Sequence, residues 1–361
     1  MRQSSYRQSL RQQILSVGPG TFESVALAVF RYQATFNPVY GAYLGHLNRD
    51  PNIVTDVRQI PFLPIGFFKT QEVITELSGL TLPDSGSITD TPLVFTSSGT
   101  TGQTTSRHRV TDASLYETSS VQAFETVYGS LKNRQILALL PSYLERTNSS
   151  LVYMIQHFMR QSTAPSNGFY LDNLDELTAQ LRRAMQQPER PVLLIGVTFA
   201  LLDWAEQHNL AFLGHHPNLT VMETGGMKGR RVELLREEVH ETLTTRLGVQ
   251  AIHSEYGMTE LLSQAYSTGA GIFRSGSTMR VLLRDLNDPF LIYSDDNGKT
   301  ESRRTGSRQT GGINVIDLAN LDSCAFVETQ DLGQYAETPD TFRVIGRFDN
   351  SDIRGCNLLV M

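Results

Sequence analysis

Residues 92–110 read PLVFTSSGTTGQTTSRHRV, an apolar run followed by a loop of small and hydroxylated residues. The run PLVFT is typical of a buried strand, and the loop begins where that strand ends. In open α/β sheets, ligands bind at the carboxyl ends of the strands. Glycine lets a loop turn its backbone amides toward an anion. The stretch therefore predicts an α/β sheet with an anion site, phosphate being the first candidate, at this strand end.

The loop does not match the phosphate loop of the P-loop nucleotidases. That motif requires GxxxxGK[ST], whereas here Gly99 and Gly102 are three positions apart and are followed by Gln103 and Thr104. From composition alone, the loop is either another kind of phosphate loop or a polar surface turn.

Strand-like and helical patterns alternate on the C-terminal side of this loop. Apolar residues recur with helical periodicity through 113–131 and 230–247. Short apolar runs that could each form a buried strand lie at 136–141, 191–197, 219–223 and 249–254. This alternation predicts an α/β fold in which helices cover a largely parallel sheet.

The pattern of residues changes near residue 275. From there on, short strand-like runs are separated by polar turn segments. We expect a large domain over 1–345, with a mainly helical lead-in (1–90), an α/β core (91–275) and a small β-rich subdomain (276–345). Residues 346–361 are expected to form a C-terminal tail.

Composition and charge narrow the function classes. The chain has 361 residues, 40% of them hydrophobic, which is enough for a large core. Its 31 basic and 37 acidic residues give a net charge of −6 and form no basic stripe, so no nucleic-acid partner is expected. No apolar run is long enough for a membrane span, and a signal-peptide core is missing. Two cysteines in so long a chain indicate a reducing compartment, so we expect a cytoplasmic protein.

Three further polar segments follow the loop: HSEYGMTELL (253–262), VETQDLG (327–333) and GRFDNSDIRG (346–355). Taken singly, each has a simpler explanation. Glu260 could be an acidic residue favoured by the dipole at the start of a helix, and Asp331 could be a turn residue. Four such segments in one order are much more specific than any of them alone.

The ordered set resembles the phosphate loop, the YGxTE motif, the ribose-binding aspartate and the hinge motif of the adenylate-forming superfamily. Within it, the chain is most similar to the acyl-protein synthetases of bacterial luminescence systems, the long-chain-fatty-acid luciferin-component ligases. This narrower resemblance is carried by IPFLPIGFFKT (60–70), PSYLERTNSSLVYM (141–154) and IRGCNLLVM (353–361). The resemblance implies the large domain of an adenylate-forming enzyme.

The resemblance also implies that ATP and Mg²⁺ are the cofactors and gives residues their roles. The implied phosphate cradle consists of Thr96, Ser97, Ser98, Gly99, Thr100, Thr101 and Gly102. Thr259 would contact the α-phosphate, and Glu260 would hold Mg²⁺, which prefers carboxylate and phosphate oxygens. Asp331 and Arg347 would bind the ribose. The implied adenine site is formed by Tyr256, Gly225 and Gly226.

Two departures from the superfamily pattern concern positive charge. The phosphate loop usually ends in a lysine, whereas this chain has Arg107 and His108 there. Most members also continue beyond the hinge into a mobile domain with a catalytic lysine. We expect that domain to be absent, with 346–361 as a hinge remnant. Lys228, Arg107 or a partner protein would then supply the charge. Lys69 could also neutralise a phosphate, although a solvated lysine is the favoured interpretation there.

The resemblance places the acyl acceptor near the C-terminus. The synthetases that this chain resembles carry the acyl group on a cysteine there, and Cys356 occupies the matching place. Neighbouring cations such as Arg354 favour the thiolate, which is the attacking species. Cys324 lies in a strand-like run and is expected to be structural.

Three functions remain open from the sequence. The first is an ATP-dependent acyl-protein synthetase that activates a fatty or related carboxylic acid and loads it onto Cys356, for delivery to an NADPH-dependent acyl reductase. The second is a ligase that passes acyl or aryl groups to coenzyme A or a carrier protein. The third is a non-catalytic nucleotide-binding subunit.

Overall fold

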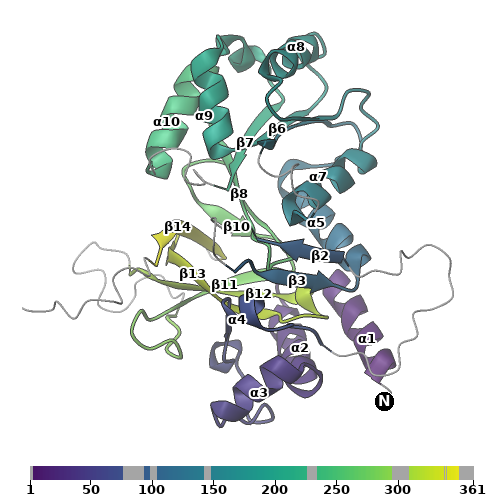
Figure 1. Ribbon diagram of the computed structural model, residues 1–361, viewed down its shortest axis with the longest axis vertical. Coiled ribbons are helices and arrows are strands. Elements are labelled where there is room, and N and C mark those ends of the chain that lie inside the picture. Colours follow the sequence, from purple (N-terminus) through teal and green to yellow (C-terminus); the bar gives the residue numbers. More distant parts are fainter. Residues whose placement is uncertain are drawn as a thin grey trace, which may run out of the picture.

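The computed structural model describes residues 3–75, 93–97, 104–141, 148–225, 234–294, 309–336, 338 and 340–348. Helices form the N-terminal end of the chain, and most strands join one long mixed sheet (Figure 1). The N-terminal helices are α1 (Gln3–Leu15), α2 (Phe22–Phe36), α3 (Pro38–His46), the 3-10 helix η1 (Val57–Gln59) and the short α4 (Phe67–Thr70). No helix in these described ranges has both the length and the apolar character that crossing a bilayer requires.

One half of the sheet is parallel. Its strands are β4 (Gln135–Leu139), β5 (Gly168–Tyr170), β6 (Val192–Val197), β7 (Leu219–Thr224) and β8 (His253–Tyr256). Neighbouring strands run parallel in the order β5-β4-β6-β7-β8. Every residue of β4 and β6 is buried, as expected for strands covered on both faces. The predicted parallel sheet is therefore confirmed.

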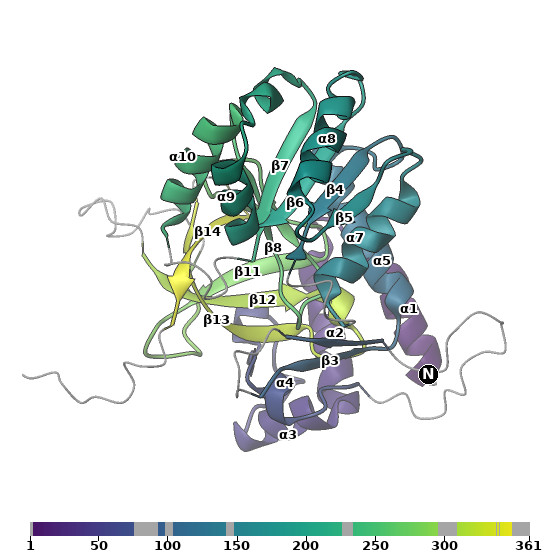
Figure 2. The ribbon, with the colours of Figure 1, turned by 45° about the horizontal axis from the view of Figure 1, so that its top comes forward.

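Helices cover both faces of this parallel half (Figure 2). They are α5 (Ala113–Tyr128), α7 (Ser150–Gln161), α8 (Leu174–Ala184), α9 (Thr198–Gln207) and α10 (Arg236–Leu247). Helix α9 packs between α10 and α8, and Trp204 Nε1 of α9 donates a hydrogen bond to Thr178 Oγ1 of α8 at 3.0 Å. Helices α5 and α7 pack together on the other face. The result is the helix-covered α/β layer that the alternating pattern predicts.

The other half of the sheet is antiparallel. Its strands are β9 (Ala265–Ser267), β10 (Phe273–Ser275), β11 (Met279–Arg284), β12 (Gly311–Asp317), β13 (Phe326–Tyr335) and β14 (Thr341–Arg347). They continue from β8 in the order β9-β10-β14-β13-β12-β11, and β1 (Leu63–Pro64) pairs with β13. The strand-rich region after residue 275 thus belongs to the same sheet as the parallel strands.

The polar loop of residues 97–106 connects two strands that stand apart from the main sheet. Strands β2 (Leu93–Thr96) and β3 (Arg107–Val110) form their own antiparallel sheet, with Thr96 opposite Arg107. The predicted position of this loop, at the end of a strand of the α/β sheet, is therefore wrong. The short connection lets the two strands pair with each other, and an apolar run by itself does not specify its partner.

The N-terminal helices are tied to the antiparallel half at one segment. The 3-10 helix η4 (Leu318–Asn320) follows β12 directly. Gln33 Nε2 of α2 donates hydrogen bonds to Asn320 O at 2.8 Å and Leu321 O at 3.0 Å. Asn37 Nδ2, between α2 and α3, donates to Ser323 O at 2.9 Å. The same segment supports the candidate active site.

Candidate active site

Tyr256, Asp331 and Arg347 meet at the junction of the two halves of the sheet. Strands β13 and β14 place Asp331 opposite Arg347, and Tyr256 ends β8. Tyr256 OH donates a hydrogen bond to Asp331 Oδ2 at 2.9 Å, and Arg347 Nε donates to Oδ1 at 2.8 Å. Burial and the Asp331 carboxylate raise the pKa of Tyr256 well above its ordinary value, so its hydroxyl remains a donor. The fold thus brings together three predicted site residues from three strands.

The tyrosine is also fixed by aromatic packing. The Tyr256 ring lies edge-on to Phe273 and Phe342, with centroid distances of 5.9 and 5.6 Å. The Arg347 side chain, by contrast, keeps 74% of its surface exposed although its Nε is bound to Asp331. Its positive charge therefore lies at the edge of the cluster, where a ligand can reach it.

Thr259 and Glu260 lie in the connection between β8 and β9. Residues 257–264 form no helix, so the alternative that Glu260 is a helix-start residue is wrong. Glu260 is only 6% exposed. Burial raises the pKa of its carboxyl, whereas the Ser106 hydroxyl and the charges of Arg347 and Lys69 lower it. A buried carboxylate close to two cations is poised to interact with charged ligands.

A buried network of hydrogen bonds fixes the connection between β8 and β9. Asp317, at the end of β12, accepts hydrogen bonds from Leu262 N at 2.6 Å, Ser263 N at 3.1 Å and Ser263 Oγ at 2.5 Å. Asn320 Nδ2 donates to Glu260 O at 2.8 Å and to Asp317 Oδ2 at 3.1 Å. The backbone at Glu260 and on its C-terminal side is therefore fixed by Asp317 and Asn320, which lie outside the four sequence motifs.

His108 supports the same connection at Thr259. His108 Nδ1 lies 2.8 Å from Thr259 O, and because a carbonyl only accepts, Nδ1 is the protonated nitrogen. Burial lowers the pKa of His108 to about 4, so the ring is neutral near pH 7. His108 is thus a buried positioning residue. It follows the signature loop in sequence, but its partner is 151 residues away.

Replacing Asp317 with alanine should lower the free energy of unfolding by about 3 kcal/mol or more, because several buried donors would lose their acceptor. Urea denaturation followed by circular dichroism measures the change. Asp172→Ala, at an exposed position, is the matched control and should have little effect. An equally small change for Asp317→Ala would show that the network does not stabilise the fold.

Thr96 and Ser97 lie at the base of the predicted phosphate loop. Ser97 N donates to Ser106 O at 3.1 Å, and Ser106 N donates to Ser97 Oγ at 2.9 Å. These two bonds close the base of the loop next to Glu260, which the Ser106 hydroxyl contacts. The predicted site residues that lie outside the described residues are Ser98, Gly99, Thr100, Thr101, Gly102, Gly226, Lys228 and Cys356.

Gly225 directly follows β7. Its φ of +79° is a left-handed conformation that glycine adopts without steric cost. Strands β7 and β8 are parallel neighbours, so Gly225 and Tyr256 lie at the same edge of the sheet. Thr224 Oγ1 donates to Glu255 Oε2 at 2.6 Å across this edge. Gly225 and Tyr256, which the resemblance assigns to the adenine site, thus lie at the ends of neighbouring strands.

Cys324 is buried in the core, and its thiol lies 3.5 Å from Phe326 O. Burial raises the pKa of this thiol to about 12, so almost no thiolate exists near pH 7. Such a thiol does not act as a nucleophile, in agreement with the structural role predicted for Cys324.

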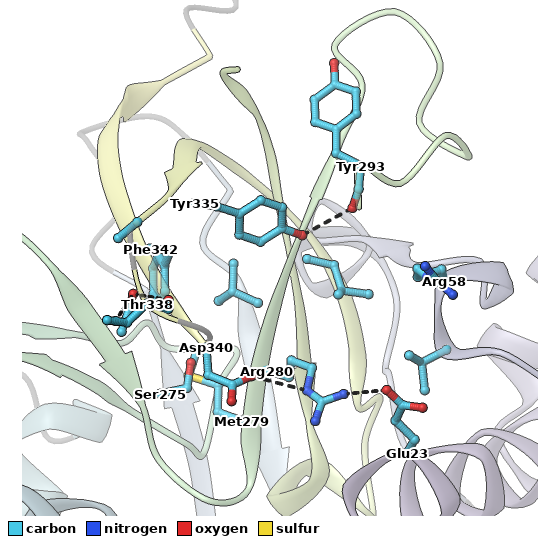
Figure 3. A pocket seen from close by; sticks show the side chains of 15 residues that line it. Glu23, Arg58, Ser275, Met279, Arg280, Tyr293, Tyr335, Thr338, Asp340 and Phe342 are labelled. Atoms are coloured by element: carbon cyan, nitrogen blue, oxygen red, sulfur yellow. Dashed lines mark hydrogen bonds and ion pairs between the residues drawn. The ribbon is translucent and has the colours of Figure 1, made fainter. Parts of the chain in front are cut away.

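A cavity of about 390 Å³ lies elsewhere, at the β11 edge of the sheet (Figure 3). Arg280 lines this cavity and forms ion pairs with Glu23 at 2.9 Å and with Asp340 at 3.9 Å. Tyr335 OH donates to Tyr293 O at 3.5 Å. None of the predicted nucleotide residues lines this cavity, so it is distinct from the candidate active site.

Within the described ranges, no cluster of three or more histidine, cysteine or carboxylate side chains could form an all-protein metal site. Mg²⁺ that binds together with a nucleotide uses one or two carboxylates with substrate phosphates and water. Glu260 is the carboxylate in the cluster that would serve, since Asp331 is already engaged by Tyr256 and Arg347.

The architecture is that of the adenylate-forming acyl-CoA ligases. The structure of a 2-hydroxyisobutyryl-CoA ligase in an open conformation with 2-HIB-AMP and CoA is similar, with a TM-score of 0.62 at 12% identity, over 94% of this chain and 78% of that chain. ATP-bound MatB from Rhodopseudomonas palustris has a TM-score of 0.50 at 16% identity, over 70% of this chain and 47% of that chain. The chain thus spans about half the length of MatB. No curated protein matches it in sequence.

The chain belongs to the acyl-protein synthetase family. The family model described as "Acyl-protein synthetase, LuxE" matches residues 20–361. The resemblance inferred from the ordered motifs is therefore confirmed, and it extends over nearly the whole sequence.

Proposed function

We propose that the protein activates a carboxylic acid with ATP and transfers the acyl group to its own Cys356. In the first step a carboxylate oxygen bonds to the α-phosphorus while pyrophosphate leaves. In the second step the Cys356 thiolate attacks the acyl carbonyl carbon and AMP leaves, giving a thioester. Family membership and the adenylate-forming fold both support activation by ATP.

The observation that carries this proposal is the convergence of Tyr256, Asp331, Arg347 and Glu260 at one edge of the sheet. Each Asp331 oxygen has more than one acceptor site, so the carboxylate can receive ribose hydroxyls while Tyr256 and Arg347 hold it in place. The Tyr256 ring, fixed by Phe273 and Phe342, would contact the adenine, and Gly225 would border it.

The phosphate end of the nucleotide would lie toward the loop base. Thr96 and Ser97 would contribute hydroxyls and amides together with residues up to Gly102, and Thr259 would contact the α-phosphate. Glu260 would hold Mg²⁺, which supplies positive charge to the phosphate oxygens. Lys228 remains a further candidate for positive charge at the reacting phosphate.

The proposed substrate is a fatty or related carboxylic acid, and the proposed recipient of the thioester is an NADPH-dependent acyl reductase. Since the composition favours a reducing compartment, we propose that the reaction takes place in the cytoplasm.

A ligase that transfers the acyl group to coenzyme A is the second candidate. It is favoured by one observation, the similarity of the fold to a 2-hydroxyisobutyryl-CoA ligase bound to CoA. The two candidates share the adenylation step and differ in the acceptor.

A screen of carboxylic acids of graded chain length, with ATP and Mg²⁺, tests both. Acyl hydroxamate formation reports activation, and intact-protein mass reports self-acylation. The proposal predicts an acid-dependent hydroxamate and one acyl mass on the protein. Free acyl-CoA without an acylated protein would favour the second candidate. ATP binding with no hydroxamate for any acid would contradict both and indicate a nucleotide-binding subunit.

A further inference from the structure

A small basic pocket of about 120 Å³ lies beside the base of the predicted phosphate loop. Its walls come from α4, the residues that follow it and the β2–β3 hairpin, and its charged lining consists of Lys69, Glu72, Arg107 and Arg109. Arg109 is paired with Glu72 at 2.8 Å. No carboxylate among the described residues forms an ion pair with Lys69 or Arg107. Only Arg109 among the three cations of this pocket is therefore in a close ion pair with a carboxylate of the described residues.

Successive side-chain contacts link the pocket to the candidate active site. Phe68, which precedes Lys69 in α4, packs edge-on to His108 with ring centroids 5.6 Å apart. His108 in turn binds Thr259 O at 2.8 Å. Helix α4 is thereby held against the connection that carries Thr259 and Glu260, although it lies near the N-terminal end of the chain.

The positions of the two cations relative to the loop agree with this connection. Arg107 is opposite Thr96 in the hairpin and follows Ser106, whose hydroxyl contacts the Glu260 carboxylate. Lys69 directly follows Phe68, which packs on His108, and His108 binds Thr259 O next to Glu260. Lys69 and Arg107 therefore each adjoin a residue that contacts the connection carrying Thr259 and Glu260.

We propose that Lys69, together with Arg107, binds the β- and γ-phosphates of ATP and stabilises the departing pyrophosphate. The proposal rests on the proposed function and adds to it a source of positive charge in the N-terminal segment. Of the two alternatives that the sequence leaves for Lys69, it selects phosphate binding over a solvated lysine.

The chemistry explains why cations belong there. When the acid oxygen bonds to the α-phosphorus, the bond from that phosphorus to the bridging oxygen breaks, and the electron pair leaves with pyrophosphate. Negative charge therefore builds up on the leaving group. A lysine ammonium is a compact charge that suits phosphate, and Arg107 adds a planar set of donors. Positioned cations of this kind lower the barrier by stabilising charge as it develops.

The test compares Lys69→Gln with the wild-type protein in two assays. Binding of inorganic pyrophosphate with Mg²⁺, measured by calorimetry, should weaken by about tenfold, as expected for loss of one charged phosphate contact. Acid-dependent adenylation should slow by about 10²-fold. AMP binding should not change, because AMP lacks the β- and γ-phosphates.

Matched variants distinguish the loss of the Lys69 charge from a general effect of substituting a lysine. Lys132→Gln removes an exposed lysine elsewhere and should leave both quantities unchanged. Lys69→Arg keeps the charge and should retain most of the pyrophosphate affinity. The proposal is overturned if Lys69→Gln retains wild-type pyrophosphate affinity and rate, or if AMP affinity falls as much as pyrophosphate affinity.

The assays also separate this proposal from the proposed function. If wild-type protein adenylates no acid but Lys69→Gln still weakens pyrophosphate binding, the anion site stands and the proposed activity fails. If wild-type protein is active and Lys69→Gln is equally active with unchanged pyrophosphate affinity, the activity stands and the role of Lys69 fails.

Discussion

Replacing Glu260 with glutamine should slow acid-dependent adenylation by about 10²-fold or more. The substitution keeps the size of the side chain and removes its negative charge. Glu260 is buried, which raises the pKa of its carboxyl, while the Ser106 hydroxyl and the charges of Arg347 and Lys69 favour the ionised form. Loss of that charge removes the carboxylate that would hold Mg²⁺ next to the phosphates.

The dependence of the rate on Mg²⁺ concentration makes this prediction specific. Glu260→Gln should need more Mg²⁺ for half-maximal adenylation, whereas AMP binding measured without metal should be unaffected. Glu237→Gln, at an exposed position of α10, provides the matched control. Wild-type adenylation by Glu260→Gln at limiting Mg²⁺ would remove Glu260 from the mechanism.

Replacing Cys356 with serine should abolish the acyl-protein adduct while leaving formation of the acyl adenylate intact. A serine hydroxyl is a far weaker nucleophile than a thiolate at neutral pH. The other cysteine offers no substitute, since burial raises the pKa of the Cys324 thiol to about 12. Cys356 itself lies outside the described residues, so its role rests on the family resemblance and on the proximity of Arg354 in the sequence.

Intact-protein mass spectrometry with and without neutral hydroxylamine measures this adduct. Wild-type protein with ATP, Mg²⁺ and the right acid should gain one acyl mass that hydroxylamine removes, as expected for a thioester. Cys324→Ser should behave like wild type if it folds. An adduct that persists in Cys356→Ser and disappears in Cys324→Ser would refute the assignment.

The parallel half of the fold could be predicted because its strands are covered on both faces. All residues of β4 and β6 are buried, so these strands appear as uninterrupted apolar runs between helical patterns. Motif order likewise predicts the grouping of Tyr256, Asp331 and Arg347, which the structure brings within hydrogen-bond distance.

Features that depend on long-range pairing could not be predicted in this way. Asp317 appears in the sequence as the end of an apolar strand, and its importance is evident only when Leu262 and Ser263 are folded against it. The predicted position of the 97–106 loop was wrong for the same reason, because local patterns do not specify which strand β2 pairs with. The contact of α4 with the site is of the same kind, because Phe68 reaches His108 only in the folded chain.

The central claim is that this site forms an acyl adenylate, and exchange of labelled pyrophosphate into ATP tests it most directly. Because adenylation is reversible, the exchange needs the acid, ATP and Mg²⁺ but neither Cys356 nor any acyl acceptor. The account predicts acid-dependent exchange in wild-type and Cys356→Ser protein, with strong loss in Glu260→Gln and Lys69→Gln. Absence of exchange across a broad set of carboxylic acids, in protein that binds ATP, would contradict it.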